Sequence, residues 1–165
     1  ASNSVDAQSA YESVISLWGA VMGGVNLLLH GAGWLEGGLL TSYEKMVIDG
    51  DILNMVSEML KPITIDDATL AVEAIAEVGP GGHFFGTSHT QERYTTEHFQ
   101  PMVSSWKNFE SWDEDGRIEA PERSTKIAQQ MIDAHQEPPM EPQIRAELDE
   151  FVERRIAEGG VETDY

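Results

Sequence analysis

The apolar run Val25-Asn26-Leu27-Leu28-Leu29-His30 limits the fold of this chain more than any other segment. A nearly continuous apolar run that leads directly into glycines is typical of a parallel strand covered on both faces. Helical spacing predicts one helix before it, over residues 6–22, and another after it, capped by Ser42. Residues 1–62 therefore predict an α/β unit with only one convincing strand. Because one strand cannot make a sheet, either the other strands lie on sequence outside this chain, or residues 25–30 are not a strand.

The remaining residues, 63–165, predict a mostly helical segment. Asp66 or Asp67 caps one helix, and Gly79-Pro80 ends it. Two further helices are expected at about 122–136 and 142–158, separated by a stiff proline-rich linker over 137–142.

The composition excludes several classes of partner. The chain has 29 acidic and 10 basic residues and a formal net charge of -19. Such a surface repels phosphate backbones and anionic lipids, so we expect neither nucleic acid nor membrane as a partner. It favours cationic substrates or a basic protein surface; an acidic surface kept for solubility or for a saline habitat is the alternative. The absence of Cys rules out disulfides and thiolate metal sites and fits a reducing cytoplasm, and no signal peptide is expected.

The glycine-rich loop Gly31–Gly38 is the first candidate site. Glycines after a strand let backbone N–H groups approach a bound group closely. The spacing is similar to a dinucleotide fingerprint with a shifted third glycine, although Trp34 is bulky for a phosphate turn. A nucleotide-binding module, or a helical interaction module, built around this loop is therefore the alternative function. His30 and Glu36 flank the loop as a candidate base and polar clamp, unless His30 is a buried structural histidine and Glu36 caps the next helix.

Two other groups of residues are candidates for a site. Trp34 and Tyr43 border the first loop, and aromatic faces are the natural means of holding a methylated ammonium group. A second glycine-rich loop, Gly79–Thr90, carries His83 and His89, but their spacing and the lack of Cys argue against a metal site. No catalytic triad, phosphate-binding loop or zinc-protease motif is present, so we assign no catalytic side chain.

Several strings taken together resemble a known family. They are Asp6-Ala7-Gln8, Leu35–Leu39 with Ser42–Asp49, Gly79–Phe84 with His89-Thr90, and Glu137-Pro138-Pro139. In this order they resemble the C-terminal portion of the trimethylamine methyltransferase family, and the resemblance covers nearly the whole chain.

The resemblance implies both a fold and a reaction. It implies that residues 1–62 are the last units of a TIM (β/α)8-type barrel and that residues 63–165 are a helical C-terminal extension. The implied reaction moves a methyl group from a tertiary or quaternary amine, trimethylamine or a glycine-betaine-like compound, to the cobalt of a partner corrinoid (cobalamin) protein. The corrinoid is carried by that partner, so this chain needs no nucleophile and binds no cofactor directly. Assembly with further copies of the chain stays open.

The resemblance also suggests a set of substrate-binding residues. Asp6 and Gln8 would follow another strand end and line the pocket, together with His30, Trp34, Glu36 and Tyr43. Because most of the barrel would lie outside these residues, we expect the isolated chain to bind substrate poorly and to be inactive.

Overall fold

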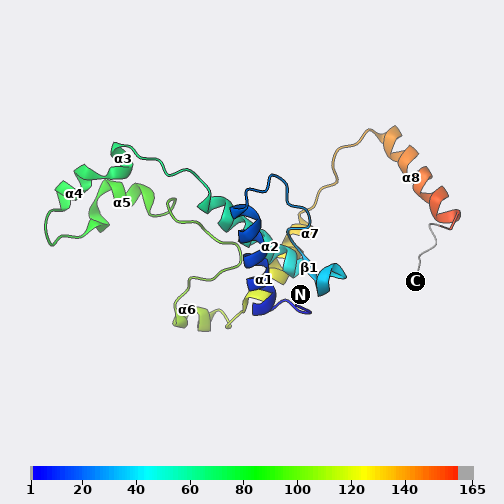
Figure 1. Ribbon diagram of the computed structural model, residues 1–165, viewed down its shortest axis with the longest axis horizontal. Coiled ribbons are helices and arrows are strands. Elements are labelled where there is room, and N and C mark those ends of the chain that lie inside the picture. Colours follow the sequence, from blue (N-terminus) through cyan, green and yellow to red (C-terminus); the bar gives the residue numbers. More distant parts are fainter. Residues whose placement is uncertain (1, 160–165) are drawn as a thin grey trace. The chain divides into compact units, whose positions relative to one another are not determined.

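The computed structural model describes residues 2–159 and is mostly helical (Figure 1). The chain divides after Met131 into two compact units, which are described separately. None of the helices within residues 2–159 is long and apolar enough to span a membrane. The α-helices are α1 (Ala7–Met22), α2 (Tyr43–Met59), α3 (Asp67–Leu70), α4 (Val72–Val78), α5 (Ser88–Arg93), α6 (Phe109–Glu114), α7 (Ala120–Asp133) and α8 (Pro142–Ala157), with 3-10 turns η1 (Glu36–Gly38) and η2 (Phe84–Gly86).

The two longest helices of the first unit, α1 and α2, begin where the sequence predicts. Asp6 caps α1 by accepting a hydrogen bond from Ser9 N, and the Ser9 hydroxyl accepts one in return from Asp6 N. Ser42 caps α2 by accepting from Lys45 N. These side chains satisfy N–H groups that have no partner within the helix. The two helices pack against each other.

The predicted strand at residues 25–30 is wrong: the segment is an irregular loop. A strand is stabilised by hydrogen bonds to a neighbouring strand, and within residues 2–159 none lies beside this run. Leu27 and Leu29 are each 73% exposed, which is the opposite of burial on both faces. At His30 the φ angle is 57°, which is incompatible with a β-strand.

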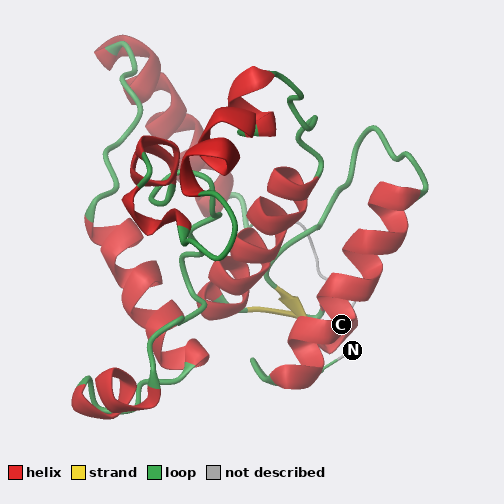
Figure 2. Cartoon of the chain, turned by 90° about the vertical axis from the view of Figure 1, so that its left-hand side faces the viewer, coloured by secondary structure: helices red, strands yellow, loops and turns green. Residues whose placement is uncertain are grey.

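The strands that the structure does describe form a small hairpin that begins in the glycine-rich loop and ends just after it. β1 (Trp34–Leu35) pairs antiparallel with β2 (Leu40–Thr41), and η1 makes the turn between them. Figure 2 shows how little of the chain is strand. The α/β expectation therefore does not hold for these residues, whose architecture is helical.

The core of the first unit joins α2 to the segment around Val103 and to α7. Val47, Val103 and Ala128 are buried together. Both oxygens of the buried Asp51 carboxylate accept backbone hydrogen bonds, from Met102 N at 2.8 Å and from Val103 N at 3.1 Å. These bonds attach a segment without regular structure to α2.

The other helices follow the prediction with one break. Asp66 caps α3, and Gly79 ends α4, but Ala71 between them takes φ 52° and divides the predicted single helix. The pair α7 and α8 corresponds to the two predicted C-terminal helices, and the proline-rich residues between them are irregular.

Candidate functional site

A cavity of about 340 Å³ lies among α1, the loop that precedes β1, and α2. Its volume is at the small end of the range for ligand pockets, which suits a compact molecule. Its walls combine hydroxyls, apolar side chains, two aromatic side chains and charged groups; the lining residues are Ser2, Ser9, Glu12, Ser13, Ser16, Leu17, Leu28, Leu29, His30, Gly31, Ala32, Trp34, Leu35, Lys45 and Asp49.

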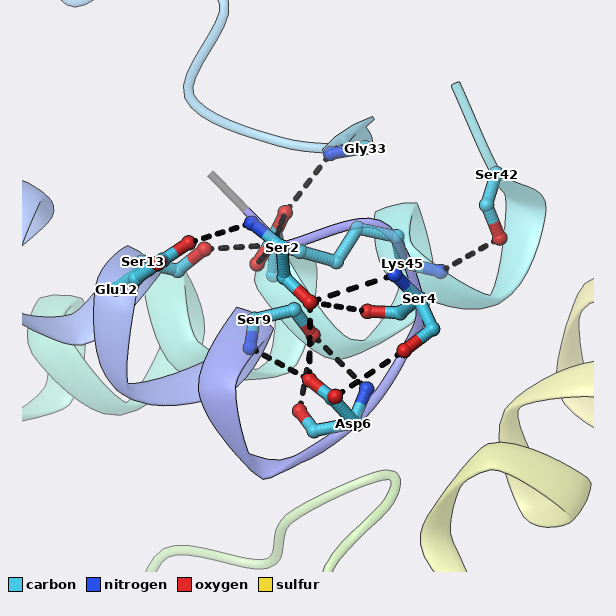
Figure 3. Close-up of polar contacts among 10 residues, drawn as sticks. Ser2, Ser4, Asp6, Ser9, Glu12, Ser13, Gly33, Ser42 and Lys45 are labelled. Carbon is cyan, nitrogen blue, oxygen red and sulfur yellow. Dashed lines mark hydrogen bonds and ion pairs between the residues drawn. The ribbon is translucent and has the colours of Figure 1, made fainter. Parts of the chain in front are cut away.

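Glu12 brings a carboxylate to this cavity. Gln8 Nε2 donates a hydrogen bond to it at 2.8 Å. Ser2 N donates another at 2.9 Å (Figure 3). These two bonds hold the pKa of Glu12 below its ordinary value, the Gln8 bond having the larger effect. The side chain is thus a carboxylate anion at neutral pH.

Lys45 and Asp49 form a buried ion pair on α2. Their side chains are 3% and 2% exposed, and Lys45 Nζ lies 2.5 Å from Asp49 Oδ1 and 2.6 Å from Oδ2. Lys45 Nζ also donates to Ser13 Oγ on α1 at 2.6 Å, and Gly33 N donates to Asp49 Oδ2 at 2.8 Å. Because the two opposite charges meet directly, they cancel at the cavity wall, and Glu12 contributes the remaining negative charge of these three.

Two of the predicted site residues, His30 and Trp34, line this cavity. Their ring centroids are 5.2 Å apart at an angle of 59°. His30 is exposed, so it is not a buried structural histidine. Trp34 is 38% exposed, which leaves part of the residue accessible.

The other four predicted site residues do not line this cavity. Asp6 is occupied as the α1 cap, and its bond from Ser9 N is the main reason that its pKa is lowered. Gln8 contributes only by holding Glu12. Glu36 accepts a hydrogen bond from Asn3 Nδ2 at 3.1 Å, and Tyr43, the first residue of α2, is 67% exposed.

Neither glycine-rich loop shows a phosphate or metal site. In the first loop Gly33 N donates to the Asp49 carboxylate, an anion that already occupies a position a phosphate would need. In the second loop, His89 Nε2 contacts Ala68 O at 2.9 Å and the His83 ring packs against Phe85. No group of three or more His, Asp or Glu side chains is suitably placed for an ion anywhere in residues 2–159.

The sequence reasoning missed Glu12, Lys45 and Asp49 as residues of the cavity wall. A signal for the pair was available, because Lys45 and Asp49 stand one turn apart on the same helix and carry opposite charges. Nothing local indicated their burial, which depends on the loop that lies over them.

The lowered pKa of Glu12 predicts a pH dependence of stability. A carboxyl with a depressed pKa in the folded state stabilises the protein above its unfolded pKa, near 4.5, and loses that contribution as pH falls through the folded value. We expect the free energy of unfolding to fall less steeply between about pH 5 and pH 3 in Glu12→Gln than in the unmodified protein. Urea titrations across this range measure the slope, with Glu150→Gln on α8 as the charge-matched control. Equal slopes in Glu12→Gln and the unmodified protein would contradict the prediction.

Comparison with known proteins gives the family. A family model described as trimethylamine methyltransferase (MTTB) matches residues 1–160. The chain is 35% identical over 161 residues to a glycine betaine methyltransferase of Desulfitobacterium hafniense, covering 98% of this chain and 33% of that protein. It is 30% identical over 150 residues to a trimethylamine methyltransferase of Methanosarcina mazei, covering 90% of this chain and 30% of the relative.

A trimethylamine methyltransferase from a second strain of D. hafniense gives a similar result, 30% identity over 156 residues, with 94% of this chain and 31% of that protein covered. The chain thus spans about a third of the length of the curated relatives it matches. Because the family model matches from residue 1 to residue 160, the chain belongs to the trimethylamine methyltransferase family.

Proposed function

We propose that the chain is the C-terminal part of an enzyme that transfers a methyl group from a tertiary or quaternary amine to a partner corrinoid protein. The family match over residues 1–160 carries this proposal. The relatives named above are methyltransferases for trimethylamine or glycine betaine, and both kinds of substrate present methyl groups on a compact nitrogen centre.

The cavity supports an ammonium ligand. An indole face attracts a quaternary ammonium group, which has no N–H to donate, and a nearby carboxylate adds a complementary charge. Trp34 and Glu12 supply these two features in a space of about 340 Å³. In this proposal His30 closes one wall beside Trp34. Asp6, Gln8, Glu36 and Tyr43 remain candidates for contacts made in the complete protein.

The corrinoid belongs to the partner protein in this proposal and is the methyl acceptor. Its reduced cobalt supplies the nucleophile, so the chain's own task is to hold the amine, orient one methyl group outward and exclude water. The cavity, of about 340 Å³, has room for a small amine.

The proposal also assigns the fold of the complete protein. Residues 1–62 would supply the last units of a (β/α)8 barrel, and residues 63–165 a helical extension; residues 1 and 160–165 of these ranges lie outside the described residues.

The test uses the complete protein mixed with a reduced corrinoid protein. Trimethylamine, glycine betaine and related amines are offered singly, and methyl–cobalt formation is followed by visible absorption. We expect transfer from at least one of these amines and none from the corresponding demethylated product. Absence of transfer from every amine, with a corrinoid protein shown to be competent in a control reaction, would refute the proposed function.

A further inference from the structure

The buried pair Lys45–Asp49 calls for an explanation, because burying two charges is costly and a pair of apolar residues usually serves stability as well. Both side chains are almost completely buried. The ion pair could form on α2 alone, since the residues are one turn apart. Its remaining hydrogen bonds leave α2 and reach two other parts of the chain.

These bonds attach α1 and the glycine-rich loop to α2 (Figure 3). Lys45 Nζ directs its hydrogen bonds to the two Asp49 oxygens and to Ser13 Oγ on α1. Asp49 Oδ2 also accepts a hydrogen bond from Gly33 N in the glycine-rich loop. A lysine ammonium has three donors, so all of them are engaged inside the protein.

Both backbone polar groups of Gly33, its N–H and its carbonyl oxygen, are hydrogen-bonded. Its N–H donates to Asp49, and its carbonyl oxygen accepts from Ser42 N at 3.0 Å. It takes φ +87°, and a Cβ at this position would lie 3.3 Å from Met46 Cε and 3.4 Å from Met46 Cβ. The loop backbone is therefore pressed onto α2 at one defined point, directly before Trp34.

We propose that Lys45 and Asp49 are positioning residues, which fix Gly33 so that Trp34 and His30 form the wall of the amine cavity. This inference rests on the proposed function. Lys45 neutralises Asp49. Asp49 can therefore anchor the loop without adding a second net negative charge beside Glu12. The pair contacts the loop backbone and not the methyl group that is transferred.

Two double variants of the complete protein separate anchoring from charge. Lys45→Met with Asp49→Leu removes both charges and the acceptor for Gly33 N. Lys45→Met with Asp49→Asn removes both charges but retains an amide oxygen for Gly33 N. We expect the leucine double variant to raise the KM for the methylated amine at least about tenfold, with kcat changed less than about threefold, and the asparagine double variant to recover most of that loss.

Trp34 provides a readout that does not depend on catalysis. In protein labelled with 5-fluorotryptophan, the ¹⁹F resonance of Trp34 is assigned by its loss in Trp34→Phe. We expect this resonance to move in the leucine double variant and to return toward its original position in the asparagine double variant. Glu58→Gln is the matched control on the same helix, because Glu58 belongs to an exposed pair with Lys61, and it should change neither KM nor the Trp34 resonance.

The possible results are distinct. Equal KM values and unmoved Trp34 resonances in both double variants would overturn the inference and leave the pair purely structural. If the leucine double variant does not fold, Asp49→Glu decides: it keeps the charge but displaces the carboxylate, so a higher KM with a moved Trp34 resonance supports positioning, and no change in either refutes it. If the unmodified protein transfers no methyl group, the proposed function fails, while the Trp34 resonance still tests the anchoring.

Discussion

Replacing Lys45 with Met is expected to lower the free energy of unfolding by about 3–5 kcal/mol, since removing one partner of a buried pair leaves the other charge without compensation. The Asp49 side chain is 2% exposed, so water cannot solvate its charge fully in the folded state. Met fills nearly the same space as the lysine stem, so the loss comes from the charge and not from a cavity. Urea unfolding followed by circular dichroism at neutral pH measures the effect.

Lys61→Met is the matched control for this experiment. Lys61 pairs with Glu58, but the two side chains are 65% and 43% exposed, and a surface pair of this kind contributes about 0–1 kcal/mol. Adding Asp49→Asn to Lys45→Met should recover much of the lost stability, because no isolated charge then remains buried. A loss in Lys45→Met no larger than that in Lys61→Met would show that the pair is not desolvated as the structure indicates.

Replacing Asp51 with Ala is expected to cost about 2–4 kcal/mol, since two backbone N–H groups, those of Met102 and Val103, lose their acceptors. Val103 belongs to the buried cluster with Val47 and Ala128, so release of this segment also weakens the contact between α2 and α7. The free energy of unfolding from urea titration gives the magnitude, and hydrogen exchange at the Val103 amide locates the change.

Two further variants serve as comparisons for Asp51→Ala. Asp51→Asn retains one acceptor oxygen and should lose about half as much stability. Asp113→Ala removes an aspartate from an exposed pair with Arg117 and should cost at most about 1 kcal/mol. If Asp51→Ala behaves like Asp113→Ala, with no faster exchange at Val103, the carboxylate does not hold the 102–103 segment.

Local signals account for what the sequence could predict. The starts of α1 and α2 depend on Asp6 and Ser42, which act on N–H groups within the next few residues. The end of α4 at Gly79 is equally local. The strand at residues 25–30 failed because a strand exists only through its neighbours, and an apolar run does not reveal whether they are present.

The site was harder to predict for a similar reason. His30 directly precedes the glycine-rich loop and Trp34 lies within it, so their place near the cavity was visible in the sequence. Glu12 and the Lys45–Asp49 pair join them only through contacts between α1, α2 and the loop. The left-handed turn at Ala71 left no local trace either, because alanine is ordinarily a strong helix former.

The exposed run at residues 25–30 has a consequence for colloidal behaviour. Exposed leucines in an irregular apolar run can pair with the same run of another molecule. What opposes such pairing is long-range repulsion from a net charge of -19, and repulsion of this kind is screened within about 10 Å at 0.1 M salt. Wherever this run is left uncovered, added salt should therefore promote association of the chain, and low ionic strength should keep it dispersed.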